Sequence, residues 1–161
     1  MSEAIIYKIL ALPGIIIALS FHEFAHAKIA DYLGDPTPGE QGRLTLNPLP
    51  HLDPIGFLML MFASFGWAKP VLISPWKFKR DITMKKGMLM VALAGPAMNL
   101  LLAIAATLIL RLYELYYFSP NTEMDWFIYY MILYLLRINI VLAIFNLIPV
   151  PPLDGSKILA G

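Results

Sequence analysis

The sequence predicts an all-α integral membrane protein with three long transmembrane helices, a short re-entrant or interfacial helix and a small β-hairpin in the cytoplasmic loop. Composition is the first reason. Hydrophobic residues make up 59% and charged residues 14% of the 161 positions, whereas soluble domains are roughly 45–50% apolar and about 25% charged. The second reason is that the apolar residues form runs long enough to cross a hydrocarbon core about 30 Å thick. So much apolar surface is typical of a protein surrounded by a lipid bilayer.

Three runs have the length of a transmembrane span. The first covers residues 4–33 and is interrupted by a few polar positions, and the second covers residues 87–112 with Arg111 near its end. The third covers residues 126–150 and contains Arg137, whose charge is costly inside a span unless it is paired. The sequence identifies no partner for Arg137.

Two shorter features lie between the first and second spans. Residues 55–66 are apolar but reach only about half the length of a span, so they predict the re-entrant or interfacial helix. Asp53 is placed to cap the N-terminus of this helix, and Pro54 takes the first helical position, where its missing N–H costs nothing. Residues 42–47 alternate polar and apolar side chains between a glycine and an Asn-Pro pair, which predicts the β-hairpin.

The distribution of lysine and arginine predicts the orientation in the membrane. The loop between the first and second spans is rich in basic residues, whereas the next loop is acidic apart from Arg111. The large loop should therefore face the cytoplasm and the N-terminus the outside, in a multi-pass protein of the plasma membrane if the source is prokaryotic. We expect one domain over residues 1–161, and the helix-like residues after Asp154 predict that this core is truncated at its C-terminus.

Net charge and cysteine content exclude several classes of function. The formal net charge is +1, and the sequence has no cysteine. We expect no nucleic-acid partner, because nucleic-acid-binding domains carry clustered basic residues. Disulfide scaffolds, cysteine zinc sites, iron–sulfur clusters and thiol nucleophiles are also excluded. A bound metal would therefore need histidine, carboxylate or backbone oxygen ligands.

The motif His22-Glu23-Phe24-Ala25-His26 lies in the second half of the first span, toward its cytoplasmic end. Residues four apart share a helix face, so His22 and His26 can present two imidazole nitrogens to one zinc ion. Glu23 lies beside that face and is placed to act as general base toward a water molecule that zinc activates. The chain has only three histidines, and ionisable residues inside a span are functional by default. We therefore expect one catalytic Zn²⁺ per chain.

A tetrahedral zinc site needs a third protein ligand. Asp154 follows the third span and lies by topology at the same membrane face as the histidines, although it could equally be the N-cap of a following helix. Asp53 fits better as the cap of the short helix, and a lone loop histidine such as His51 is more often structural than a ligand. The other acidic candidates are Asp31 and Asp35.

Three motifs in order resemble the site-2 protease family of intramembrane zinc metalloproteases, in its short branch without a PDZ domain. They are the HExxH motif, the segment Ala94-Gly95-Pro96-Ala97-Met98-Asn99 and residues 146–155. The resemblance implies three core transmembrane helices and cleavage of transmembrane protein substrates near the cytoplasmic face. It also implies that His22, His26 and Asp154 hold the zinc, which favours Asp154 over the other candidate ligands.

Two asparagines are further candidates for the site. Asn99 and Asn146 could contact the substrate or the oxyanion of the tetrahedral intermediate, although an asparagine in a span can also simply bond to a neighbouring helix.

Two alternatives to an intramembrane protease stay open: a membrane-anchored zinc peptidase acting on soluble proteins, and a non-catalytic metal-binding membrane protein. Glu23 argues against the second, because zinc binding needs only the ligands. The position of the motif inside an apolar span argues against the first.

Overall fold

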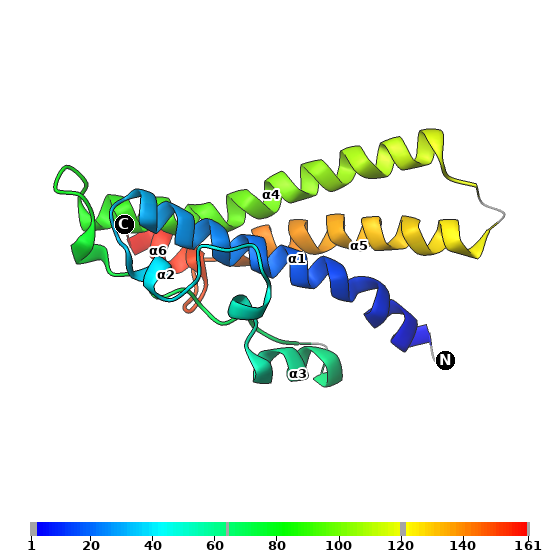
Figure 1. Ribbon diagram of the computed structural model, residues 1–161, viewed down its shortest axis with the longest axis horizontal. Helices are drawn as coiled ribbons and strands as arrows, with labels where there is room; N and C mark the ends of the chain where they lie inside the picture. Colours follow the sequence, from blue (N-terminus) through cyan, green and yellow to red (C-terminus); the bar gives the residue numbers. More distant parts are fainter. Residues whose placement is uncertain (1–2, 64, 120–121, 161) are drawn as a thin grey trace.

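The computed structural model describes residues 3–63, 65–119 and 122–160. Three long helices, α1 (Glu3–Tyr32), α4 (Met84–Tyr116) and α5 (Glu123–Asn146), form a bundle in which each packs against the other two (Figure 1). α1 and α5 run in one direction and α4 in the opposite one. The start of α1 and the α4–α5 connection therefore lie at one end of the bundle, and the short helices α2 (Thr37–Glu40) and α6 (Asp154–Ala160) lie at the other.

The three long helices are long and apolar enough to cross a membrane, which confirms the prediction of a helical protein with three helices that could span a bilayer. Their bounds differ from the predicted spans by up to four residues: α4 extends beyond the second predicted span at both ends, and α5 begins earlier and ends earlier than the third. α5 ends at Asn146, before the predicted end at residue 150. Pro149 causes this difference, because its nitrogen cannot donate to the carbonyl of Phe145 and its ring disfavours a helical Ile148. The helix predicted after the third span is present as α6.

Small residues allow the long helices to approach closely, as is usual in membrane bundles. Four alanines are buried between them: Ala18, Ala103, Ala106 and Ala143. At Gly14 in α1, an added Cβ would lie 3.1 Å from the Cα of Leu135 in α5. The interior of the bundle is therefore narrow, and a polar side chain inside it must find its hydrogen-bond partner on its own helix or on the facing one.

The predicted short helix is α3 (Pro54–Ala63), which lies to one side of the bundle (Figure 1). Asp53 caps it as predicted, since its Oδ1 accepts a hydrogen bond of 2.8 Å from the backbone N–H of Gly56. The chain then returns across α3, where the carbonyl of Trp67 would clash with any Cβ at Gly56. At its far end, α3 is tied to α1, because Lys8 Nζ donates to the carbonyl of Met61 at 2.7 Å.

The β-hairpin predicted at residues 42–47 is wrong. This segment forms turns and bends, and β pairing among the described residues is limited to one antiparallel bridge between Leu52 and Ala68. The short 3₁₀-helix η1 (Leu49–His51) follows it directly. Prolines at positions 48 and 50 explain part of the difference, because neither has an N–H to donate to a strand pair.

Buried side chains take over the hydrogen bonding that a hairpin would have supplied. The Arg43 guanidinium is buried and donates to the carbonyls of Pro50 and Lys69. His51 is fully buried, and its Nε2 donates to the carbonyl of Thr45 at 2.8 Å. Each of these side chains satisfies individual backbone carbonyl oxygens, so the loop folds without a ladder of β-sheet hydrogen bonds.

The remaining loop folds over the end of the bundle that carries α2 and α6. Asp35 is fully buried and accepts hydrogen bonds from the backbone N–H groups of Thr37 (3.0 Å) and Ser74 (2.6 Å). The short 3₁₀-helix η2 (Pro75–Lys77) follows, and Phe78 then packs into a small core with Leu33 and other apolar residues of α1 and α4. The loop is thereby held against the part of α1 that contains the histidines.

Candidate metal centre

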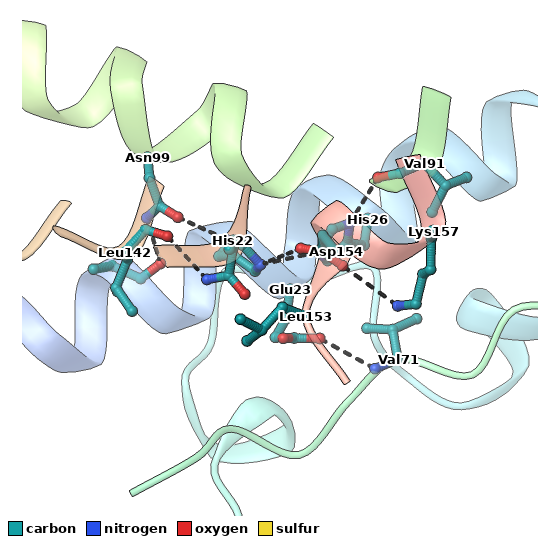
Figure 2. A network of polar contacts seen from close by, with 12 residues as sticks. His22, Glu23, His26, Val71, Val91, Asn99, Leu142, Leu153, Asp154 and Lys157 are labelled. Carbon is teal, nitrogen blue, oxygen red and sulfur yellow. Dashed lines mark hydrogen bonds and ion pairs between the residues drawn. The ribbon is translucent and has the colours of Figure 1, made fainter. Parts of the chain in front are cut away.

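Three potential metal ligands from two distant segments meet at this end of the bundle. His22 and His26 lie one turn apart on α1, and Asp154 is the first residue of α6. All three are buried, and their side chains point toward one another (Figure 2). The Oδ2 atom of Asp154 lies 3.1 Å from Nε2 of His22 and 3.0 Å from Nε2 of His26, and the two Nε2 atoms are 3.0 Å apart.

This donor set fits a zinc ion. Zinc bonds of about 2.0–2.1 Å place the donors of a tetrahedral site about 3.3–3.4 Å apart. The three atoms would therefore need to move by only a few tenths of an ångström. Two imidazoles and one carboxylate leave a fourth position open, as in catalytic rather than structural zinc sites.

In both histidines, Nδ1 forms a hydrogen bond that points away from the donor triangle, the triangle formed by the two Nε2 atoms and Oδ2 of Asp154. Nδ1–H of His22 donates to Oδ1 of Asn99 at 2.6 Å, and Nδ1–H of His26 donates to the carbonyl of Val91 at 2.7 Å. Bonds of this kind fix the tautomer and orient the ring. Both Nε2 lone pairs are thereby directed toward the same point.

Asn99 belongs to a buried polar network between the three long helices. Its amide nitrogen donates to the carbonyl of Ala18 on α1 (3.1 Å) and to Oδ1 of Asn139 on α5 (2.8 Å). Asn139 in turn donates to the carbonyl of Leu135. Both asparagines are fully buried. The amide of Asn99 therefore orients His22 and links the metal centre to the bundle.

The carboxylate of Asp154 is shared between the histidines and a lysine. Oδ1 lies 3.3 Å from Nζ of Lys157, one turn further along α6, while Oδ2 faces the imidazoles. Burial on its own raises the pKa of the Asp154 carboxyl, but hydrogen bonds and positive charge from His22 and His26, when these rings are also protonated at Nε2 in the metal-free protein, hold this pKa well below its usual range. The group is therefore an anion at neutral pH, as a metal ligand must be.

Glu23 lies beside the donor triangle and lines the same cavity, which has a volume of about 120 Å³. Its Oε2 accepts a hydrogen bond of 3.1 Å from the backbone N–H of Val71, in the loop that covers the site (Figure 2). Asn146, at the end of α5, also lines the cavity, and its amide nitrogen donates to the carbonyl of Leu142 at 3.0 Å. The cavity thus brings together a carboxylate, an amide and the three potential ligands.

The other candidate ligands lie elsewhere. His51 is held in the loop and Asp53 caps α3. Asp35 accepts its two hydrogen bonds from loop amides, and Asp31 forms an ion pair of 3.9 Å with Lys28. Among the described residues, the only set of three or more potential ligands close enough to share an ion is His22, His26 and Asp154.

Gly95 is the point at which α4 touches the metal centre. A Cβ added there would lie 2.5 Å from Nε2 of His26 and 2.6 Å from Nε2 of His22. These distances are too short for real atoms, so any side chain would occupy the space of the ligands or of the ion. The sequence places Gly95 in the second motif of the resemblance but gives no sign of its contact with the ligands.

Replacing Gly95 with alanine is expected to weaken zinc binding by about 10- to 100-fold, because overpacking of a buried site costs about 1–3 kcal/mol. Competition with a chromogenic chelator measures the change. Ala97→Val, on the exposed side of the same helix, is the matched control and should bind zinc like the parent. Equal affinity of Gly95→Ala and the parent would mean that the close approach of α4 does not shape the site.

Two further site residues are absent from the sequence-based candidates. Asn139 is a polar residue inside an apolar span, which is a usable signal, but its connection to His22 runs through Asn99 and depends on the packing of three helices. Lys157 follows Asp154 by three residues, a spacing that places both on one face once α6 is known to be helical.

Similarity to known proteins points to a peptidase family. A family model described as peptidase family M50 matches residues 112–161. The chain is 38% identical to YwhC of Bacillus subtilis, over 99% of this chain and 73% of that protein. It is 34% identical to Rip2 of Mycolicibacterium smegmatis, over 91% of this chain and 54% of that protein, and 31% identical to Rip2 of Mycobacterium tuberculosis, over 94% and 56%.

All three relatives carry the name "Putative zinc metalloprotease". The chain spans about half the length of the two mycobacterial proteins. No solved structure matches it.

Proposed function

The chain belongs to peptidase family M50, the site-2 proteases, and from this premise we propose that it is an intramembrane zinc endopeptidase with one zinc ion per chain. His22, His26 and Asp154 would hold the ion. The observation that carries the proposal is the convergence of their three donor atoms, within 4.8 Å of one another, inside a bundle of helices that are long and apolar enough to cross a membrane.

The chemistry follows from the groups that line the cavity. Zinc, when bound, would polarise the scissile carbonyl and lower the pKa of a water molecule beside it. Glu23 is the proposed general base, taking a proton from that water and passing it to the leaving amine. The hydrogen bond from Val71 holds the Glu23 carboxylate at the cavity, so the base is positioned before a substrate arrives.

The two asparagines have different proposed roles. Asn146 lines the cavity, and we assign its amide to the substrate backbone or to the developing oxyanion. Asn99 is instead a positioning residue, because its oxygen already accepts from His22 and its nitrogen donates to two other helices. Its replacement should act through the orientation of His22.

The proposed substrate is a transmembrane segment, cut near the cytoplasmic face of the membrane. This is the face that we assign to the loop between α1 and α4, which is rich in basic residues. The ligands lie in or next to the apolar bundle, which favours this substrate over a soluble protein bound to an anchored peptidase. Peptide bonds in a membrane helix are shielded by the hydrogen bonds of the helix itself. Hydrolysis must therefore begin with local unwinding of the substrate.

Cleavage of a synthetic transmembrane peptide by the purified, zinc-loaded chain in detergent tests this function. Peptides with Gly, Pro or Asn next to the scissile bond should be cut faster than a peptide with Leu at those positions, because they unwind at lower cost. Product formation is followed by mass spectrometry, and metal content is measured on the same samples.

A soluble peptide with the same local sequence is the control. If it is cut as fast as the transmembrane peptides, or if exchange of Gly for Leu has no effect, the anchored peptidase is the better description. Zinc binding without cleavage of either kind of peptide would favour a non-catalytic metal-binding protein.

A further inference from the structure

Arg137 occupies an unusual position, because it lies well inside a helix that could span a membrane. It is in α5 (Glu123–Asn146), two residues before the buried Asn139. At a rise of 1.5 Å per residue, it is about 13 Å from the level of Asn146 and about 21 Å from the start of the helix. Its side chain is exposed rather than packed into the bundle.

Arg137 lines a groove between α1, α3 and α5 with a volume of about 560 Å³. The other lining residues are apolar apart from Tyr134, and Arg137 is the one charged side chain among them. The groove extends along α1 and α5 toward the level of the metal centre, since it is also lined by Leu19, one turn before Glu23, and by Leu142, whose carbonyl accepts from Asn146. It thus connects the level of Arg137 to the level of the catalytic groups.

Among the residues that the structure describes, no counter-charge accompanies Arg137. In the described parts of the chain, none of the ion pairs or side-chain hydrogen bonds includes it. The other intramembrane cation of this region, Lys8, is bonded to the carbonyl of Met61. An unpaired guanidinium in a hydrocarbon environment is expensive and usually faces a cavity or an anionic partner.

We propose that this groove binds the transmembrane segment of the substrate and that Arg137 selects segments carrying an aspartate or glutamate about 13 Å from the scissile bond, a separation of about nine residues where the segment is helical and fewer where it is unwound. This inference rests on the proposed function and narrows its substrate class. The acid would be on the membrane side of the cut, where α5 places Arg137 relative to Asn146.

Charge complementarity and depth favour an acidic transmembrane segment as the occupant of the groove. A guanidinium and a carboxylate form a bidentate, charge-assisted pair, and each offsets part of the cost of burying the other. A lipid phosphate lies at the headgroup level, whereas Arg137 is more than two helical turns from either end of α5. A carboxylate carried inside a transmembrane helix reaches that depth directly.

Binding to the Glu23→Gln protein, loaded with zinc in lipid nanodiscs, tests the proposal without cleavage. The probes are fluorescent transmembrane peptides with Glu, Gln or Lys at positions covering one helical turn around the predicted site. The Glu peptide should bind at least about tenfold more tightly than the Gln peptide. Arg137→Gln should abolish this preference, and Arg137→Glu should transfer it to the Lys peptide. Arg111→Gln, on the far end of α4, should keep the preference for Glu.

Three results would overturn the proposal. The first is equal binding of the Glu and Gln peptides, and the second is a preference for the Glu peptide that survives in Arg137→Gln. The third is an effect of Arg137→Gln on the binding of anionic lipid but not on the choice between peptides. Cleavage by the Glu23 form is scored separately. Selective binding without cleavage would refute the proposed protease and leave the groove assignment intact. Cleavage with unselective binding would support the protease and refute the role of Arg137 in the groove.

Discussion

Asp154→Ala is expected to lose zinc and peptidase activity together. In the folded chain this carboxylate lies 3.0–3.1 Å from both imidazole Nε2 atoms, so its removal leaves two protein ligands. The loss of zinc affinity should exceed the roughly 10- to 100-fold that follows removal of an outer hydrogen-bond partner of a metal ligand. Metal content after dialysis against a weak chelator, measured with the cleavage rate, checks this expectation.

The candidates that do not join the metal centre provide the controls. Asp53→Ala should cost about 0.5–2 kcal/mol of stability through the lost cap of α3 and keep its zinc. His51→Ala should also keep its zinc, because its imidazole bonds to the loop carbonyl of Thr45. Full zinc in Asp154→Ala, combined with loss in either control, would overturn the assignment of the third ligand.

Glu23→Gln is expected to keep stoichiometric zinc and to lose about 10²–10⁴-fold in the cleavage rate, the contribution of a general base. The amide cannot take the proton of the attacking water, but its oxygen can still accept the hydrogen bond from Val71. The cavity and the loop should therefore keep their shape. Single-turnover cleavage and metal analysis on the same preparation separate the two effects.

Glu114→Gln is the matched control for this substitution. Glu114 lies near the far end of α4 and pairs with Arg111 at 3.0 Å, so its neutralisation should leave cleavage unchanged. If Glu23→Gln stays active, the base is another group. If it loses its metal, Glu23 is needed for binding, and the division of roles between Glu23 and the three donors is wrong.

Local sequence patterns were sufficient for most of the helices. Each long helix is recognisable from its own apolar run, and α3 from its length and the Asp53-Pro54 start, because these signals depend on neighbours within a few residues. The pairing of His22 with His26 is of the same kind, since a helix places residues four apart on one face. The hairpin failed because its alternation spans only six residues, and the bonds made by Arg43 and His51 are not visible in a local pattern.

What the sequence determined by itself was the helical membrane class, the two histidines with Glu23 between them, and the cap of α3, all of which follow from spacing along one segment. The tertiary structure alone decided how Asp154 meets those histidines, how Asn99 and Val91 orient the imidazoles, and why position 95 has no side chain. The physical reason is that these contacts join residues up to 132 positions apart, and their distances depend on how closely three helices pack. The groove beside Arg137 has the same origin, because its walls come from α1, α3 and α5.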